Sequence, residues 1–364
     1  MEKIIKDVLE KIENNNFKAY LVGGYVRDFL RKKETNDFDI CTNATPKDLI
    51  EIFSEYKLTP LEYGNVYLNI DNIKIEITTF RKELSYKNNR KVDSLEYVNT
   101  YEEDIVRRDF TINTICMDKD GKIIDLLNGK KDIHKKIIRC VGEPNYKMKE
   151  DSLRILRAIR FATEFKFKIE ESLKKAIIDN KDLLKKLSYE RKKEELNKIF
   201  NSDNKKYGVR LIKELGLENV LELTNIDNVL LTKDPIGIWA TIVKVDTYPF
   251  TKYEKEIIRD INELLEKDLS DIFNLYKYGP YIISICCDIK KLNKKKYLKK
   301  YDNLPIKDKN EIKISSDEIC NILEKEPGSF LKDVFETIEK DILLGKVKND
   351  KLELKKYIKN NFMI

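Results

Sequence analysis

The sequence predicts an α+β protein with a small mixed β-sheet and flanking helices in residues 1–140 and helices throughout the rest. Two observations predict this class. Short apolar or alternating runs, which are typical of strands, recur up to residue 125. After Gly142-Glu143-Pro144 the apolar residues follow helical spacing to the end of the chain, with breaks at glycine and proline.

The elements follow from these patterns in order along the chain. An amphipathic helix is expected over residues 1–17, where apolar side chains recur at helical spacing between lysines and glutamates. The apolar run 19–22 predicts a buried strand that ends at Gly23-Gly24, and a helix is expected to begin at Val26. Further strands are predicted where short apolar runs recur: 38–40, 66–70, 74–80, 96–98, 112–117 and 123–125.

Composition limits the class of protein. The 364 residues, 41% of them hydrophobic, are enough for two or three packed domains. No run of about 18 apolar residues occurs, and the first seven residues lack the apolar core of a signal peptide. We therefore expect a cytoplasmic protein with no membrane partner.

Cysteine and histidine usage limits the chemistry. The six cysteines lie without C-x-x-C or His/Cys ligand spacing, so we expect free thiols rather than disulfides or zinc. His134 is the only histidine, which excludes His-dependent triads, HExxH zinc proteases and HD-type phosphohydrolases. Acid, base or metal chemistry must come from carboxylates. The net charge of +7 is compatible with a basic face that meets phosphates.

A pair of aspartates is the first candidate site. Asp37 and Asp39 stand at i and i+2, so on a strand they project from one face. Mg²⁺ takes carboxylate oxygens together with substrate phosphates, and Glu76 could supply a third carboxylate. A solvated turn is the alternative in so charged a sequence. The preceding Gly23-Gly24, where backbone N–H groups can approach a triphosphate, and Arg27 one turn later favour the metal site.

Eight short segments follow one another in a characteristic order. They are LVGGYVRD (21–28), DFDI (37–40), TNATP (42–46), IEITTFR (75–81), RRDFTIN (107–113), DLLNG (125–129), EDSLRILRAIRFA (150–162) and ERKKEEL (190–196). Through them the sequence resembles the class II tRNA nucleotidyltransferases and bacterial poly(A) polymerases. The resemblance is dense over residues 19–200 and is closest to the CCA-adding enzymes of that family.

The resemblance implies a domain order. Residues 1–140 would form the nucleotidyltransferase head that carries catalysis, and 141–205 a helical neck with the nucleotide-selecting motif. Residues 206–310 would form a helical body, and 311–364 a helical tail that binds tRNA. The coarse secondary-structure pattern agrees with this order.

The resemblance also implies roles for residues around the carboxylates. Asp37 and Asp39 would bind two Mg²⁺ ions, one activating the RNA 3′ hydroxyl and the other holding the triphosphate. Gly24 and Arg27 would hold phosphates, and Arg108 would reach the triphosphate or ribose. For Arg108 the alternative is a surface ion pair at the start of a strand. The products would be an extended RNA and pyrophosphate.

A second group of residues would select the nucleotide. Asp151 and Arg154 are three apart on a predicted helix and lie one turn apart on one face. Cytosine and adenine both present an amino donor beside a ring-nitrogen acceptor, so one carboxylate and one guanidinium admit C and A but not U or G. An ordinary helical salt bridge is the alternative.

The same helix continues with two more arginines. In the family, the positions of Arg157 and Arg160 also line the nucleotide pocket, and a basic helix face that touches RNA is the alternative. A later helix is expected to begin after Ser188, a suitable N-cap. Its residues Glu190 and Arg191 are expected to brace the neck and are left out of the site.

The resemblance thus implies an enzyme that adds CCA to tRNA from CTP and ATP without a template. The alternatives are a poly(A) polymerase, an enzyme that adds only CC or only the final A, a small-molecule nucleotidyltransferase, and a non-catalytic RNA-binding protein. Residues 81–96 look polar and mobile. CC-only family members resemble a form shortened in this segment, and no shortening is visible here. The intact Asp37 and Asp39 argue against a purely binding role.

Overall fold

The computed structural model describes residues 2–56, 58–60, 64–71, 73–87 and 91–363. The chain divides into two compact units, Met1–Leu223 and Thr224–Ile364. The finer division into head, neck, body and tail remains a prediction.

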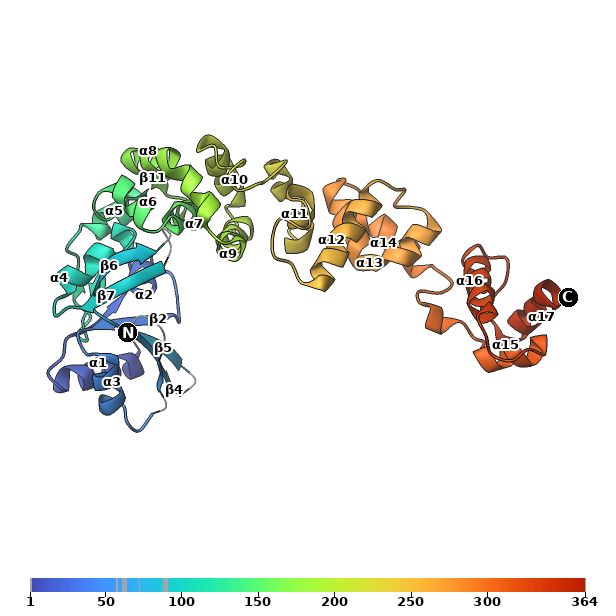
Figure 1. The fold of residues 1–364 in the computed structure, drawn as a ribbon, viewed down its shortest axis with the longest axis horizontal. Helices are drawn as coiled ribbons and strands as arrows, with labels where there is room; N and C mark the ends of the chain where they lie inside the picture. The colour runs from blue at the N-terminus through green and yellow to red at the C-terminus, as the bar shows by residue number, and fades with distance from the viewer. Residues whose placement is uncertain (1, 57, 61–63, 72, 88–90, 364) are drawn as a thin grey trace. The chain divides into compact units, whose positions relative to one another are not determined.

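The first unit is built on a mixed sheet in which most neighbouring strands are antiparallel (Figure 1). Its strand order is β3-β4-β5-β2-β1-β8-β9, and β2 runs parallel to β5. The strands are β1 Ala19–Val22, β2 Phe38–Thr42, β3 Leu58–Pro60, β4 Asn65–Ile70, β5 Ile73–Thr79, β8 Cys116–Met117 and β9 Ile123–Ile124.

Helices α1 (Lys3–Asn14) and α3 (Pro46–Ile52) cover one face of this sheet and lie side by side (Figure 1). The alternation of β5 explains the packing, because Ile75 and Ile77 are fully buried in the same core as the apolar stripe of α1. Helix α3 begins at a capping box in which Thr45 and Asp48 each accept a backbone N–H of the other. Because side chains alternate along a strand, Glu76, which lies between Ile75 and Ile77, points to the opposite face of the sheet.

The opposite face is only partly covered. Val22, Cys41 and Cys116 from the sheet pack there against Phe80 and Tyr101. Tyr101 begins the short helix α4 (Tyr101–Asp104), which is followed by the 3₁₀ turn η2 (Ile105–Arg107). Beyond this layer, Asp39 of β2 and Glu76 of β5 stay partly exposed.

Two predicted elements differ from the structure. The segment 81–96, expected to be polar and mobile, was not predicted as a strand pair before residue 96, but it contains a hairpin of β6 (Arg81–Lys87) and β7 (Lys91–Tyr97), with residues 88–90 outside the described part. Its mobility remains a prediction. Opposite charges face each other across it at Lys82 and Glu96, which favours strand pairing. The strand predicted at 112–117 is a 3₁₀ turn, η3 (Thr111–Asn113), followed by the two residues of β8. The Thr114 hydroxyl and amide both donate to the Thr111 carbonyl and turn the chain there.

The rest of the first unit is helical, as predicted, apart from one small parallel pair, β10 (Ile137–Ile138) with β11 (Lys168–Ile169). Helix α2 lies earlier, directly after β1. The helices are α2 Gly24–Leu30, α5 Gly129–Lys135, α6 Pro144–Glu150, α7 Leu153–Phe165, α8 Glu171–Asn180, α9 Tyr189–Phe200 and α10 Lys205–Glu214, with the 3₁₀ turn η4 Lys181–Lys186.

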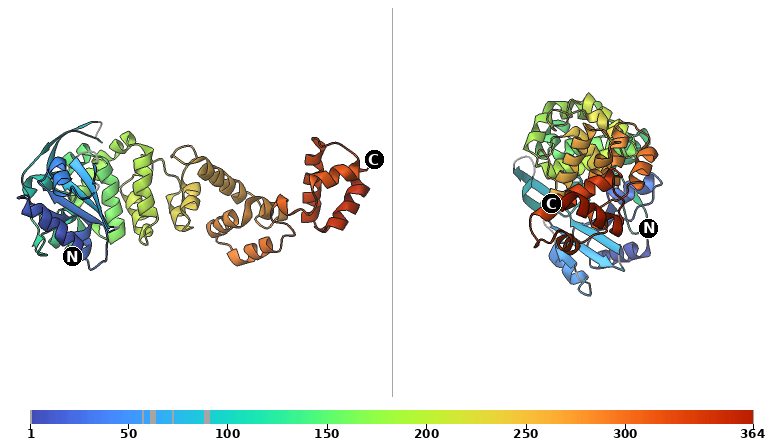
Figure 2. Two further views of the ribbon diagram at one scale, coloured as in Figure 1. Left: turned by 90° about the horizontal axis from the view of Figure 1, so that it is seen from below. Right: turned by 90° about the vertical axis from the view of Figure 1, so that its right-hand side faces the viewer.

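The second unit is all helical within the described residues. Its last three helices, shown in red in Figure 2, share a core formed by Ile319, Ile338 and Leu354. No helix among the described residues is both long and apolar enough to cross a membrane. The elements are η5 Ile226–Leu230, α11 Pro235–Ile242, α12 Lys252–Leu265, α13 Ile272–Ile289, α14 Lys294–Asp302, η6 Lys309–Glu311, α15 Ser316–Leu323, α16 Phe330–Leu343 and α17 Lys351–Phe362.

Candidate functional site

Three carboxylates lie together where β2 and β5 begin to pair. Asp37 precedes β2, and Asp39 is the second residue of that strand. In the parallel register, Asp39 lies directly beside Glu76 of β5, so both side chains project from the partly open face. The structure therefore brings the three predicted carboxylates Asp37, Asp39 and Glu76 together.

The electrostatics of this group favour a cation. Burial, followed by the negative charges of Asp37 and Glu76, raises the pKa of Asp39 to about 7. A divalent cation between these oxygens would relieve that repulsion. No group of three or more side chains among the described residues is arranged to enclose a metal ion. Asp37 and Asp39 could hold Mg²⁺ in its usual manner, because this ion is bound by one or two carboxylates, water and substrate phosphates.

A glycine turn lies against the carboxylates. Gly23 follows β1 with φ of +72°, a conformation that L side chains rarely adopt. A Cβ on Gly23 would lie 3.5 Å from Oδ2 of Asp39. Helix α2 begins at Gly24, and no side chain caps its first N–H groups, the kind of group that binds anions at the start of a helix.

Arg27, which was predicted to hold phosphates, contacts other protein side chains and links α2 to neighbouring elements. Its guanidinium donates to Asp28 at 2.7 Å and to Oδ1 of Asn113 at 2.8 Å. It also lies 4.6 Å from the centre of the Phe165 ring on α7. Arg27 is 9% exposed. The structure thus places Arg27 beside the glycine turn with protein partners, and its phosphate contact remains a prediction.

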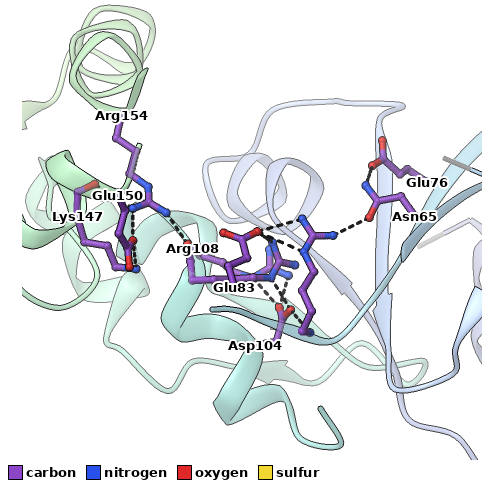
Figure 3. Close-up of polar contacts among 10 residues, drawn as sticks. Asn65, Glu76, Glu83, Asp104, Arg108, Lys147, Glu150 and Arg154 are labelled. Atoms are coloured by element: carbon purple, nitrogen blue, oxygen red, sulfur yellow. Dashed lines mark hydrogen bonds and ion pairs between the residues drawn. The ribbon is translucent and has the colours of Figure 1, made fainter. Parts of the chain in front are cut away.

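Arg108 is the cation held beside the carboxylates. Its Nε and Nη2 donate to Oδ2 of Asp104 at 3.2 and 3.0 Å (Figure 3). Its guanidinium lies 5.7 Å from the centre of the Tyr101 ring. The positive charge of Arg108 lowers the pKa of Asp39 against the larger effect of burial. The sequence prediction did not identify Asp104, a buried carboxylate that also accepts from Arg107 at 2.8 Å.

The prediction that Asp151 and Arg154 share one helix is wrong: Arg154 lies in the first turn of α7, whereas Asp151 follows α6 in an extended conformation, before α7 begins. Each of the two side chains contacts other residues. Oδ1 of Asp151 accepts from the Leu153 amide at 3.0 Å, and Oδ2 lies 3.4 Å from Nη2 of Arg191. Arg154 donates to the carbonyl oxygens of Lys147 at 3.0 Å and of Arg107 at 2.9 Å.

Glu150 also pairs with Arg154. Figure 3 shows the Arg154 side chain extending from α7 toward the loop that carries Arg108. Arg191 was left out of the predicted site, although it lies beside Asp151. The only signal in the sequence for Arg191 as a site residue is that it lies in the family segment 190–196. The expected N-cap at Ser188 has no side-chain capping bond.

Arg157 and Arg160 both have acidic partners. Nη2 of Arg157 lies 2.6 Å from Oδ2 of Asp109, and Nε of Arg160 donates to Glu195 at 2.7 Å. Burial of Asp109 opposes its ionisation. The charge of Arg157 and the hydrogen bonds from Asn113, Arg157 and the Phe110 amide outweigh this and lower the pKa of Asp109 to about 2. These pairs join α7 to the head segment and to α9, and a nucleotide contact remains a prediction.

Comparison with known proteins agrees with this geometry. Residues 19–139 match the family described as "Poly A polymerase head domain". Residues 166–225 match "Probable RNA and SrmB- binding site of polymerase A", and 248–358 match tRNA nucleotidyltransferase domain 2.

Relatives also match over nearly the whole length of this chain. The CCA-adding enzyme of Ligilactobacillus salivarius is 32% identical over 94% of this chain and 93% of its own length. That of Staphylococcus haemolyticus is 33% identical over 99% and 98%. The crystal structure of the Bacillus stearothermophilus CCA-adding enzyme in complex with CTP matches at 25% identity with a TM-score of 0.85, covering 99% of this chain and 98% of that one. The chain belongs to the CCA-adding enzyme family of nucleotidyltransferases.

Proposed function

We propose that this enzyme adds C, C and A to the 3′ end of tRNA, using CTP and ATP and no nucleic-acid template. The observation that carries the proposal is the carboxylate group Asp37, Asp39 and Glu76 beside the Gly23 turn, in a chain that aligns with CCA-adding enzymes over nearly its whole length. In each step the RNA 3′ oxygen forms a bond to the α-phosphorus of the nucleotide, and the bond from that phosphorus to pyrophosphate breaks.

Residues of the head would bind the metal ion and the triphosphate. Asp37 and Asp39 would hold Mg²⁺, which when bound neutralises the triphosphate and lowers the pKa of the RNA 3′ hydroxyl. Without side chains at Gly23 and Gly24, the phosphates would be able to approach the start of α2. Arg108, held in place by Asp104, adds positive charge on the same side of the carboxylates.

The neck residues would replace a template. A carboxylate such as Asp151 accepts a hydrogen bond from the amino group of C or A, and a guanidinium such as Arg154 donates to the adjacent ring nitrogen. Uracil and guanine would leave these groups unpaired, which is costly in a buried site. In the structure Arg191 and Glu150 contact the two side chains, so we infer that nucleotide binding exchanges those contacts.

Two further parts of the proposal rest on the family. Residues 311–364 would bind tRNA, and a tRNA-processing role favours the cytoplasm as the location.

The test uses tRNA transcripts that end before CCA, after C and after CC, each incubated with Mg²⁺ and one labelled nucleotide. We expect C to be added to the first two transcripts and A to the third. The variants Asp37→Ala and Asp39→Ala should lose incorporation on all three, as should removal of the metal with EDTA. Incorporation that survives both substitutions would refute the assignment of the catalytic site.

A further inference from the structure

A cavity of about 510 Å³ opens beside the catalytic carboxylates and contains none of the arginines or glycines predicted to bind the nucleotide. It lies in the first unit, and its volume falls in the usual range for small-ligand sites. Its polar and aromatic lining includes Glu2, Asp37, Tyr67, Lys74 and Glu76.

The strand register fixes where this cavity lies relative to the rest of the site. Tyr67 of β4 pairs directly with Glu76 of β5, and Glu76 pairs directly with Asp39 of β2. The three side chains therefore form one row across the same face of the sheet. Tyr67 stands at the β4 end of this row, and Asp39 stands next to β1.

The predicted nucleotide contacts lie toward the other end of the row. Arg108 lies against Tyr101, which packs with Val22 of β1 and Cys116 of β8. In Figure 3, Arg108 and Arg154 likewise lie away from Glu76 and Asn65. The carboxylates thus separate two regions of one face, and a transfer reaction between two substrates needs a place for each.

The charge of the cavity favours one of the two substrates. Three carboxylates, Glu2, Asp37 and Glu76, face it, with Lys74 as the one cation among the lining residues described. This balance repels a triphosphate but suits ribose hydroxyls, which donate hydrogen bonds that carboxylates accept. The terminal nucleoside of an RNA chain presents such hydroxyls and only one phosphodiester.

The aromatic ring supplies a surface for the base. Nζ of Lys74 lies 3.5 Å from the centre of the half-buried Tyr67 ring. Lys74 is exposed and makes no ion pair within the described part of the chain. It can therefore move to a phosphate while a base stacks on the ring, as bases do on aromatic side chains in single-stranded RNA sites.

We propose that this cavity binds the 3′-terminal nucleoside of the RNA acceptor, with its base on Tyr67, its ribose hydroxyls toward Glu76 and its phosphodiester near Lys74. The terminal 3′ oxygen would then lie beside Asp37, where the new bond forms. The inference rests on the proposed function, because it assigns the acceptor of that reaction to a place in the head.

The test compares Tyr67→Ala with Tyr67→Phe, which keeps the ring, and with Lys74→Ala at the exposed neighbour. Binding is measured without chemistry, using a tRNA transcript whose last base is 2-aminopurine, since stacking quenches its fluorescence. Loss of base stacking should weaken RNA binding about 5- to 150-fold in Tyr67→Ala and abolish the quenching, while Tyr67→Phe stays near the wild type. Lys74→Ala should weaken binding and reduce its salt dependence. The Kd for CTP should be unchanged in all three.

Three results would overturn the assignment: full quenching in Tyr67→Ala, an equal loss in Tyr67→Phe, or a rise in the Kd for CTP as large as that for RNA. Thermal unfolding of each variant identifies misfolding, and Lys74→Ala provides the answer if Tyr67→Ala is unfolded. Tyr67-dependent quenching in a chain that incorporates no nucleotide would refute the proposed function and leave the RNA site in place.

Discussion

Replacing Asp104 with asparagine should both destabilise the first unit and weaken nucleotide binding. The Asp104 side chain is 0% exposed, whereas those of Arg107 and Arg108 are 15% and 14% exposed. Asp104 accepts from both arginines at 2.8 to 3.2 Å and from the backbone N–H of Arg81 at 3.2 Å. Asp104→Asn keeps the shape but leaves two neighbouring guanidinium groups without their shared negative charge.

The size of the effect follows from this burial. Removing one partner of a buried ion pair costs about 3–5 kcal/mol, since the remaining charge stays desolvated. With a urea dependence of about 2–3 kcal/mol/M, the unfolding midpoint of the first unit should fall by about 1–2.5 M. The KM for CTP should also rise, because Arg108 loses the contact that directs it toward the carboxylates.

The matched control is Glu103→Gln, one residue earlier. Glu103 pairs with Lys82 at the surface, where both side chains are well exposed, so its loss should change neither stability nor KM noticeably. Urea unfolding followed by circular dichroism, together with initial rates at varied CTP, measures both effects. An Asp104→Asn variant that unfolds at the same urea concentration as Glu103→Gln would show that Asp104 does not stabilise the first unit through its buried charge.

Three further predictions concern the same unit. Because the pKa of Asp109 is about 2 in the fold against an ordinary 3.8, its ionised form adds about 2 kcal/mol of stability above pH 4. That stability should be lost as the pH falls toward 2, and urea unfolding between pH 5 and 2.5 should show a shallower dependence for Asp109→Asn. Gly23→Ala should cost at least about 1 kcal/mol through its positive φ and lower the rate of incorporation, whereas Gly121→Ala, also at positive φ but with open space around it, should lose stability only. Asp151→Ala should lower the preference of the enzyme for C and A over U and G in single-nucleotide incorporation, and Arg191→Ala should shift it less.

The sequence predicted the fold where local patterns decide it. The apolar stripe of α1 and the alternation around Ile75 and Ile77 correctly predicted the helix and the strand. The strand predicted at 38–40 carries Asp39, with Asp37 one residue before it, and the parallel register brings Glu76 beside Asp39.

Contacts between distant segments were the part that the sequence did not reveal. The donation of Arg154 to the carbonyl of Arg107 and the approach of Arg191 to Asp151 join residues about 40 or more positions apart. Helical spacing describes neighbours on one helix only, so it suggested a pair formed by Asp151 and Arg154 alone. The hairpin at 81–97 was missed for a related reason, because strand pairing depends on the facing strand as much as on local composition.

The proposed function is tested most directly by the nucleotide sequence that the purified enzyme adds to the 3′ end of an RNA. A tRNA transcript that lacks CCA would be incubated with Mg²⁺ and all four nucleotides, and its 3′ ends sequenced. We expect C, C and A followed by arrest, and no addition by the Asp37→Ala or Asp39→Ala variant. Tails of many adenosines, arrest after CC, or addition of U or G by the wild-type chain would contradict the proposed function.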